Sequence, residues 1–483
     1  MFNNLHEECG VFGIFENKTT YAAQSVYLGL YALQHRGQES CGIAVNDDGV
    51  FRHHRGDGLV HEVFTGDKME HLGMGNMAIG HVRYSTTGGK NANNIQPLVI
   101  RHIKGNLAVA HNGNLVNAPD LRKQFELKGG IFHGTSDTES IAYSIVSERL
   151  TSKSTEEAVE KVMNTLKGAY SCIVMTATKL IAFRDPDGFR PLCLGKTADG
   201  AWIVSSESCA IDSVGAEFVR DIEPGEIVVI STEGVKSLKH HCGSKGNICV
   251  FEYIYFARPD SVIEGSSVQH ARMRAGKFLA KEHPVEADIV IGVPDSGLDA
   301  ALGYAQESKI PYGIGFVKNR YIGRSFIQPN QNQREDAVRI KLNVVKENIK
   351  GKRVIMIDDS IVRGTTCARI VELLREAGAE EVHMRVSSPP FKYPCFFGTD
   401  VDSQENLIAC KFGTVDEIAK EIGADSLGYL SVEATKKLAE NSCCGFCDGC
   451  FTGSYPVEVP KEQPKDKFEE KLNLFSPYYQ VLD

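Results

Sequence analysis

VIMIDDSIVRGTT, residues 354–366, is the stretch that predicts the fold of the half of the chain around it. Its first four residues are apolar and have the length of a buried β-strand, and the run that begins at Thr365 has the apolar period of a helix. A strand, a short loop and a helix in this order are typical of a parallel sheet with helices on its faces. Ligands bind beyond the carboxyl ends of such strands, where Asp358 and Asp359 are expected.

The loop after this strand carries groups that suit a sugar phosphate. The two carboxylates can bind ribose hydroxyls or a magnesium ion, and the N–H groups of a helix N-terminus attract phosphate. The residues that add hydroxyl, guanidinium and N–H groups are Ser360, Arg363, Gly364, Thr365 and Thr366. Each part alone also fits a solvated turn or a helix cap. Together they resemble the type I phosphoribosyltransferase signature, which implies binding of the ribose and 5-phosphate of phosphoribosyl diphosphate (PRPP).

Length and composition indicate an ordinary protein of several domains. The chain has 483 residues, 42% of them hydrophobic, which suggests two to four domains with separate cores. No apolar run approaches the ~20 residues that span a bilayer, and the start, MFNNLHEE, lacks the features of a signal peptide. We therefore expect a cytoplasmic protein with no membrane partner. The formal net charge of −9 gives no basic excess to attract nucleic acid.

Cys9 opens an apolar run, CGVFGIF, that has the character of a strand. A cysteine in a strand is usually a small buried hydrophobic residue, and the 14 cysteines of this chain are too dilute for a disulfide scaffold. Removal of residues 1–8 as a propeptide would make Cys9 the first residue. Its own α-amino group, with a pKa near ~7.7, could then act as the base for its thiol.

The residues that follow resemble the glutamine amidotransferases of the N-terminal-nucleophile class. Five motifs occur in that family's order: CGVFG at 9–13, LQHRGQES at 33–40, GHVRYST at 80–86, AHNGNLVN at 110–117 and SDTE at 136–139. The resemblance implies an oxyanion hole made by the Asn112 side chain and the Gly113 N–H. It implies that Arg83 binds the α-carboxylate of glutamine and Asp137 its α-ammonium. His35 is expected to be architectural, because the terminal amine is the base.

Each of these residues also has an ordinary structural interpretation. Arg83 would be a surface residue, and Asp137 would be a helix N-cap. Asn112 and Gly113 would form a type I′ hairpin turn. The agreement of several motifs favours the functional interpretation.

The pattern along the chain predicts an α+β half, an α/β half and a C-terminal segment. Residues 9–240 are expected to form the glutaminase domain, two antiparallel sheets packed between helices (αββα). A polar stretch rich in Gly, Ser and Lys at 231–247 marks the boundary. Residues 249–430 are expected to form a phosphoribosyltransferase domain, a parallel sheet with helices on both faces, and residues 431–483 the C-terminal segment. Its strands are expected at 287–293, 310–316, 353–357 and 381–387.

Two more stretches complete the expected transferase site. VEADIVIGVPDSG at 285–297 reads as a strand that ends in a turn. The resemblance makes this turn the pyrophosphate loop, with Ser296 joining Asp358 and Asp359 at one Mg²⁺ per subunit. The loop at 317–335 has no apolar period and is predicted to close over a diphosphate. Its basic residues are Lys318, Arg320, Arg324 and Arg334. A plain β-turn and a solvated loop are the alternatives.

A dense group of cysteines, CCGFCDGC at 443–450, has the C-x-x-C spacing of zinc or iron–sulfur ligands. The residues alone leave both metals open. The chain resembles the iron–sulfur-containing subset of glutamine PRPP amidotransferases, which implies one [4Fe–4S] cluster per subunit. Its implied ligands are Cys249, Cys395, Cys447 and Cys450. Because Cys444, Cys447 and Cys450 also form C-x-x-C-x-x-C, a ferredoxin-like set with Cys444 or Cys443 is the alternative.

The three motif groups together resemble the glutamine PRPP amidotransferase family over nearly the whole chain. The resemblance implies a two-step reaction in which ammonia released from glutamine displaces diphosphate from PRPP at the start of purine synthesis. Purine nucleotides are expected as feedback inhibitors, and a homo-oligomer is expected. Glucosamine-6-phosphate synthase would lack VIMIDDSIVRGTT and the cysteines, and a non-enzymatic PRPP-binding purine regulator would lack the glutaminase motifs.

Overall fold

The computed structural model describes residues 9–84, 92–319, 342–399, 401, 403–440, 442 and 444–460. They divide into two compact units. One unit holds residues 9–248 and Phe396–Thr399, with 456–460; the other holds Cys249–Cys395 and the described residues of 401–455. The expected propeptide, Ser85 and Thr86 of one motif, Cys443 and most of the 317–335 loop lie outside the described residues.

Two antiparallel sheets pack face to face in the unit that contains residues 9–248. The seven-stranded sheet has the order β11 (Glu217–Asp221), β9 (Cys193–Lys196), β10 (Trp202–Ser205), β1 (Gly10–Thr20), β4 (Gly75–Arg83), β2 (Ser40–Asp47), β3 (Val50–Asp57). The six-stranded sheet has the order β13 (Gly234–Leu238), β12 (Ile227–Ser231), β8 (Leu180–Arg184), β7 (Gly168–Met175), β6 (Gly105–Leu115), β5 (Leu98–His102).

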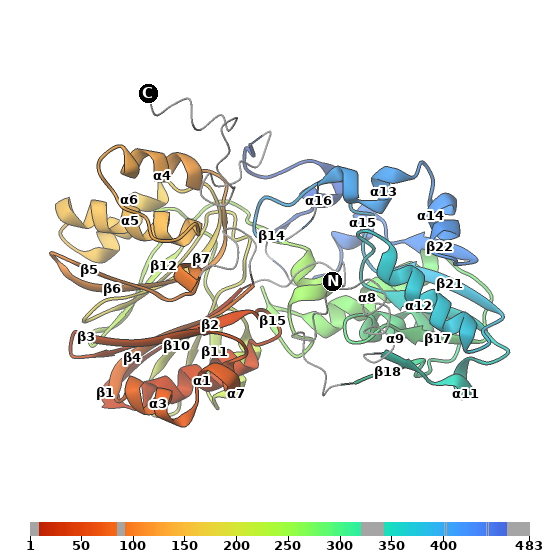
Figure 1. Cartoon of the computed structure of the whole chain (residues 1–483), viewed down its shortest axis with the longest axis horizontal. Coiled ribbons are helices and arrows are strands. Elements are labelled where there is room, and N and C mark those ends of the chain that lie inside the picture. Colours follow the sequence, from red (N-terminus) through yellow and green to blue (C-terminus); the bar gives the residue numbers. More distant parts are fainter. Residues whose placement is uncertain are drawn as a thin grey trace, which may run out of the picture. The chain divides into compact units, whose positions relative to one another are not determined.

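Alternation along the strands explains this layering, because successive side chains of a strand point to opposite faces. On β1, Val11 and Phe15 pack into the core between the two sheets, whereas Phe12 and Ile14 pack against the helices outside. The helices over the seven-stranded sheet are α1 (Ala22–Ala32), α2 (Val60–Val63), α3 (Gly66–Leu72) and α7 (Ser208–Ser213). Those over the six-stranded sheet are α4 (Ala118–Glu126), α5 (Asp137–Thr151) and α6 (Thr155–Met163) (Figure 1). The predicted αββα sandwich is confirmed.

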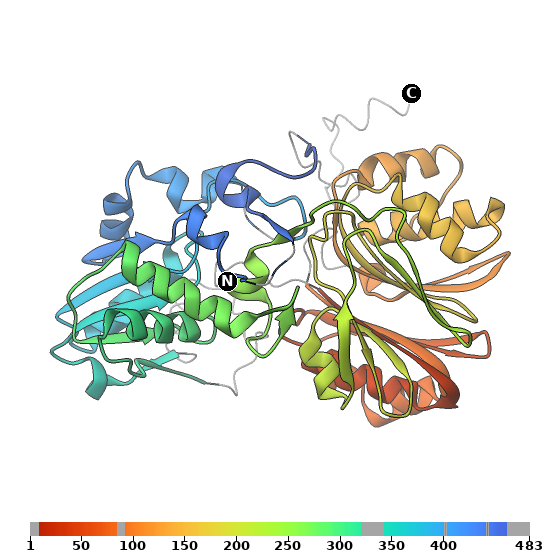
Figure 2. The same cartoon turned by 180° about the vertical axis from the view of Figure 1, so that it is seen from behind.

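The other unit is built on a parallel sheet, as its alternating strand and helix patterns predict. Its strand order is β17 (Ile289–Gly292), β20 (Arg353–Asp358), β21 (Glu381–Val386), β22 (Ser426–Tyr429). One face is covered by α12 (Thr365–Glu376) and α14 (Val415–Glu421), whose apolar residues share a core with alternate residues of the strands. Helices α8 (Val268–Glu282) and α9 (Gly297–Ser308) lie on the opposite face, since they stand in front of the sheet in Figure 2 and α12 does so in Figure 1.

Helices α8 and α9 pack unusually close to each other. A Cβ atom at Gly276 of α8 would lie 1.8 Å from the carbonyl oxygen of Ala300, and one at Gly303 of α9 would lie 1.9 Å from that of Met273. Both positions therefore exclude a side chain, which lets the two helices lie flat together over the sheet.

One expected strand is wrong. Residues 310–316 were predicted to be a strand of the parallel sheet, but only Tyr312 forms an isolated parallel bridge, to Val290 of β17. Pro311 cannot donate to a ladder, and Gly313 and Gly315 lie directly over the side chains of Ile289 and Ile291. The regular strand begins later, as β18 (Phe316–Lys318), and pairs antiparallel with β19 (Leu342–Val344).

Smaller elements complete the two units. Two further two-stranded sheets pair β14 (Asn247–Cys249) with β23 (Gly445–Cys447) and β15 (Val262–Ile263) with β16 (Ser266–Ser267). The short helices are η1 (Ala92–Asn94), η2 (Glu252–Phe256), η3 (Gln404–Asn406), α11 (Lys346–Ile349), α13 (Ile408–Lys411), α15 (Val432–Thr435) and α16 (Gly449–Thr452). None of the helices in the described part of the chain combines the length and apolar character needed to cross a bilayer.

Candidate functional site

Cys9 stands immediately before β1 and is held there through its backbone. Its carbonyl oxygen accepts a hydrogen bond from Nε of Arg36 at 3.1 Å, and Nη1 of Arg36 lies 2.6 Å from Oε1 of Glu207. Arg36 and Glu207 are both fully buried. Since removing one partner of a buried ion pair leaves an uncompensated charge, the pair fixes the start of β1 firmly. The Cys9 thiol is half-buried and donates to the Tyr84 carbonyl at 3.6 Å.

Sequence reasoning missed Glu207, which carries no local motif. The strand order brings it to Cys9, because β10 pairs with β1 with Ser205 opposite Phe12. His35, predicted to be architectural, lies with Nε2 at 2.8 Å from the same Glu207 carboxylate. This contact is in line with a supporting role, which stays a prediction.

Asn112 and Gly113 lie inside β6, so their interpretation as a hairpin turn is wrong. The Nδ2 atom of Asn112 is buried and has no hydrogen-bond partner among the described residues. An unpaired buried donor costs about 1–3 kcal/mol. Such a group is poised to donate to an atom that a ligand brings, such as a developing oxyanion.

Asp137 is the first residue of α5, and the N-cap is Ser136, so the interpretation of Asp137 as the cap is wrong by one position. Its Oδ2 accepts a hydrogen bond from the Leu115 N–H at 2.9 Å, and its Oδ1 lies 3.6 Å from Nδ1 of His111. Burial opposes ionisation of Asp137, but His111 and the N–H groups of Leu115 and Thr138 outweigh it and lower its pKa. The side chain is therefore a buried carboxylate.

Arg83 ends β4 and is buried, so the surface interpretation of this residue is also wrong. Gly10 pairs with Val82 across β1 and β4, which places Cys9 and Arg83 at the same end of the sheet. His81, on β4, lies with Nε2 at 3.0 Å from the His111 carbonyl oxygen of β6, and so ties the two sheets together at this end. Burial and the nearby Arg83 lower the pKa of His81 to about 3, so its ring is neutral.

The three strands β1, β4 and β6 and the start of α5 thus bring all five predicted glutaminase residues to one end of the sandwich: Cys9, Arg83, Asn112, Gly113 and Asp137.

Asp358 is the last residue of β20, and Asp359 follows it, as the sequence predicts. Both side chains are buried. The hydroxyls of Ser296 and Ser360 donate to the two oxygens of Asp359, and the Asp359 N–H donates to Oδ1 of Asp358 at 2.9 Å. The fold therefore places Ser296, at the end of the 294–296 turn before α9, beside the acidic pair.

Ionisation of Asp358 and Asp359 is electrostatically unfavourable. Burial, and then the charge of Asp359, raise the pKa of Asp358 well above its usual value. Burial also raises the pKa of Asp359, although Ser296, Ser360 and the positive charge of Arg272 act against the rise. Two buried carboxylates that repel each other favour a bound cation, because the cation cancels both the repulsion and part of the desolvation cost.

The other predicted loop residues surround the start of α12. Ser360, Gly364 and Thr366 are partly exposed, and Arg363 and Thr365 are exposed. Gly364 is the N-cap, with a φ of 84°, and α12 begins at Thr365. This end of the helix is thus at the surface of its unit, where a helix N-terminus can attract a phosphate. In the 317–335 loop, Lys318 contacts Asp295 of the 294–296 turn; Arg320, Arg324 and Arg334 lie outside the described residues.

Four cysteines from distant parts of the sequence gather in the parallel-sheet unit. The Val250 N–H donates to the Cys447 carbonyl, and the Lys392 and Tyr393 N–H groups donate to that of Cys450. Burial raises the pKa of the Cys450 thiol, and Cys395, Cys249 and Cys447 raise it further. In the described residues, however, no three Cys, His, Asp or Glu side chains converge as metal ligands. The thiols are thus neighbours rather than an assembled ligand shell.

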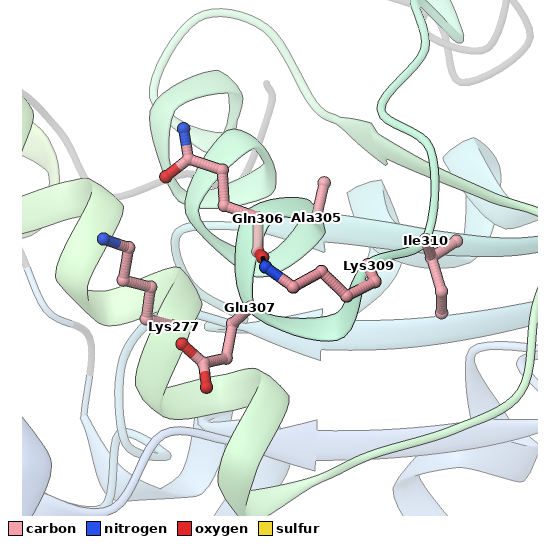
Figure 3. Close-up of a pocket in the computed structure, with 6 residues that line it drawn as sticks. All are labelled: Lys277, Ala305, Gln306, Glu307, Lys309 and Ile310. Atoms are coloured by element: carbon pink, nitrogen blue, oxygen red, sulfur yellow. Dashed lines mark hydrogen bonds between the residues drawn. The ribbon is translucent and has the colours of Figure 1, made fainter.

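A surface hollow of about 570 Å³ lies between α8 and the C-terminal end of α9 (Figure 3). Its lining residues are Lys277, Ala305, Gln306, Glu307, Lys309 and Ile310. None of them belongs to a predicted site. Its open, mixed-charge lining offers no convergent set of polar groups, so we assign no function to it.

Comparison with known proteins agrees with the two-unit architecture. Residues 81–213 match the glutamine amidotransferase domain family, and residues 267–388 match the phosphoribosyl transferase domain family. The chain is 50% identical over 459 residues to an amidophosphoribosyltransferase of Bacillus subtilis, with 94% of this chain and 95% of that protein covered. It is 49% identical over 465 residues to one of Methanocaldococcus jannaschii, with 93% and 98% covered.

Two solved structures are similar to the chain over nearly its whole length. The chain is similar to glutamine PRPP amidotransferase from B. subtilis in complex with ADP and GMP, with a TM-score of 0.87, 49% identity, and 94% of this chain and 99% of that one covered. A structure described as the allosteric regulatory enzyme of purine biosynthesis has a TM-score of 0.88 at 49% identity, with 96% and 99% covered.

The raised pKa of Asp358 leads to a prediction about stability. A carboxyl group whose folded-state pKa lies above its unfolded value destabilises the fold as pH rises from the unfolded pKa, about 4, through the folded one. Asp358→Asn is therefore expected to raise the unfolding temperature of the ligand-free protein at pH 8, and to raise it less at pH 4. Scanning calorimetry measures both. Asp416→Asn, on the exposed side of α14, should not reproduce the effect; an equal shift at both pH values would contradict it.

Proposed function

The chain belongs to the amidophosphoribosyltransferase family, and we propose how its residues divide the reaction of that family between two centres. The enzyme transfers the amide nitrogen of glutamine to C1 of PRPP, and 5-phosphoribosylamine, glutamate and diphosphate are formed in the first committed step of purine synthesis. The phosphoribosyl transferase match distinguishes it from glucosamine-6-phosphate synthase, and the glutamine amidotransferase match from a PRPP-binding regulator.

In the proposed glutaminase centre, Cys9 is the nucleophile. After removal of residues 1–8, the α-amino group of Cys9 accepts the thiol proton, and the thiolate attacks the amide carbon of glutamine. The C–N bond breaks, ammonia leaves with the proton, and water hydrolyses the resulting thioester to glutamate. The hydrogen bond from Arg36 to the Cys9 carbonyl, backed by Glu207, supports this assignment because it fixes the position of the nucleophile.

The oxyanion formed in this attack is proposed to accept hydrogen bonds from Asn112 Nδ2 and the Gly113 N–H. The single observation that carries the proposal is the Asn112 amide, buried and without a hydrogen-bond partner among the described residues. A donor that is unpaired before the reaction needs no other bond broken to stabilise the developing charge.

Glutamine is proposed to be held by Arg83 at its α-carboxylate and by Asp137 at its α-ammonium. The lowered pKa of Asp137 supports this role, since an ionised carboxylate is required to pair with an ammonium group.

In the proposed transferase centre, Asp358 and Asp359 bind the ribose hydroxyls, and the loop around the start of α12 binds the 5-phosphate. The loop residues are Ser360, Arg363, Gly364, Thr365 and Thr366. A magnesium ion fits beside Ser296, Asp358 and Asp359, because the pair is buried, anionic when ionised and already contacted by the Ser296 hydroxyl. When bound, Mg²⁺ would neutralise charge on the diphosphate leaving group.

Two further features are proposed, an iron–sulfur cluster and inhibition by purine nucleotides. A [4Fe–4S] cluster is proposed at Cys249, Cys395, Cys447 and Cys450, and the support for it is that the Cys450 thiol is buried within the influence of the other three. The cluster would be structural, since neither half-reaction transfers electrons. The B. subtilis enzyme was solved with ADP and GMP, which supports the proposal that purine nucleotides are feedback inhibitors of this chain as well. A homo-oligomer remains a prediction.

Cys9→Ser tests the division into two centres. It should abolish glutamine-dependent synthesis, by about 10³-fold or more, because the nucleophile is lost. Synthesis from ammonia should stay within about twofold, since the transferase centre is intact. Asp359→Asn should lower both activities together, because PRPP binding precedes attack by either nitrogen source. Both rates are measured by PRPP consumption, and loss of ammonia-dependent synthesis in Cys9→Ser would contradict the division.

The cysteine assignment has its own test in anaerobically purified protein. Iron and acid-labile sulfide should be present in equal amounts, and Ser at any of the four proposed ligand positions should abolish them. Cys444→Ser is the matched control and should retain the cluster. Bleaching by Cys444→Ser but not by Cys249→Ser would favour the ferredoxin-like set, and zinc without sulfide would overturn the cluster.

A further inference from the structure

Four residues of the chain, Phe396–Thr399, lie in the glutaminase unit although the residues on both sides of them belong to the parallel-sheet unit. Arg190, which is fully buried, donates to the Phe397 carbonyl oxygen through Nε at 3.1 Å and Nη2 at 2.7 Å. Nη2 also lies 3.3 Å from the Thr399 hydroxyl. The Phe397 ring stacks on Phe189, with centroids 4.2 Å apart. These contacts fix the segment as part of a packed core.

The segment reaches the strand that carries the proposed oxyanion hole. The Asn114 side chain on β6 donates to the Phe396 carbonyl oxygen at 2.8 Å. A Cβ atom at Gly398 would lie 3.3 Å from Nη2 of Arg190, 3.3 Å from the carbonyl carbon of Gly113 and 3.5 Å from the Cα of Gly113. The backbone of Gly398 therefore packs against the backbone of Gly113.

Gly113 is enclosed from its other side as well. Its partner on β7 is Tyr170, whose N–H donates to Oδ2 of Asp185 at 3.0 Å. Oδ1 of Asp185 accepts a hydrogen bond from the Phe189 N–H at 3.3 Å. The contacts thus form a closed ring, from Gly113 through β7 and the 185–190 turn to the 396–399 segment and back to Gly113.

We infer that the 396–399 segment, held by Arg190 and Asn114, is a positioning element for the oxyanion hole, so that glutamine hydrolysis depends on residues inserted from the transferase part of the sequence. This inference rests on the proposed role of Asn112 and Gly113. A backbone donor contributes fully only when it points at the developing charge, and a shift of 1 Å can cost on the order of 100-fold in rate. Gly398 limits such a shift by direct contact.

Gly398→Ala tests this positioning role. The added methyl group would press on Gly113 and on the Arg190 guanidinium that holds the segment. Glutamine-dependent turnover is therefore expected to fall on the order of 10- to 100-fold, with little change in KM for glutamine. Ammonia-dependent synthesis should stay within twofold. Alkylation of Cys9 by iodoacetamide needs no oxyanion hole, so its rate should also be unchanged. Arg190→Lys, which cannot make the forked contact with Phe397, should show the same pattern more weakly.

Gly105→Ala is the matched control for backbone strain. Gly105 is the first residue of β6, the strand that contains Gly113, and its φ of 116° is close to the 115° of Gly398. A Cβ atom at Gly105 would have no neighbour within 4 Å. It should keep glutamine-dependent turnover. Equal losses in both glycine variants, full activity in Gly398→Ala, or slower Cys9 alkylation would overturn the inference. Asn112→Ala, assayed alongside, tests the proposed oxyanion hole itself: full glutamine-dependent turnover in that variant would reject the proposed function and not the positioning role alone.

Discussion

The burial of two adjacent carboxylates, Asp358 and Asp359, at the end of one strand is the constraint on which the transferase half depends. Burial and mutual repulsion make their ionised state costly. The fold moderates the cost with hydroxyls of Ser296 and Ser360 from two loops, which requires β17 and β20 to end side by side. The parallel register therefore sacrifices some stability at the point where the cation and the sugar are proposed to bind.

The glutaminase half uses buried polar groups in two different ways. Glu207 satisfies the charge of Arg36, and Arg36 bonds the Cys9 carbonyl oxygen, so the pair helps to hold the backbone of Cys9 in place. Asn112 is buried but unsatisfied among the described residues, which suits a group whose partner arrives with the substrate. Arg36 and Glu207 thus differ from Asn112: the first two orient the nucleophile, whereas Asn112 is proposed to contact the substrate.

Local patterns predicted most of the fold and the candidate residues, because a strand, its terminal side chains and the following helix N-terminus are consecutive in sequence. This is so for β20, Asp358 and α12, and for Cys9 and β1. Glu207 and the contact of Arg190 with Phe397 could not be predicted, because only the tertiary fold joins residues 171 and 207 positions apart and neither carries a motif. The error at 310–316 arose because Pro311, Gly313 and Gly315 interrupt an otherwise apolar run.

Burial beside Asp359 holds the pKa of Asp358 well above its usual value, and a cation bound with PRPP at this pair is expected to lower that pKa. The measurement is proton release on addition of Mg²⁺ and PRPP, without a nitrogen donor, in weakly buffered solution over a range of pH values, with the release in protein-free solution subtracted. The wild-type enzyme should release protons that the Asp358→Asn variant does not, because the raised pKa of Asp358 returns toward its usual value when the cation binds. Equal release by the two proteins, with PRPP bound to both, would show that the pair is already ionised and would contradict the account.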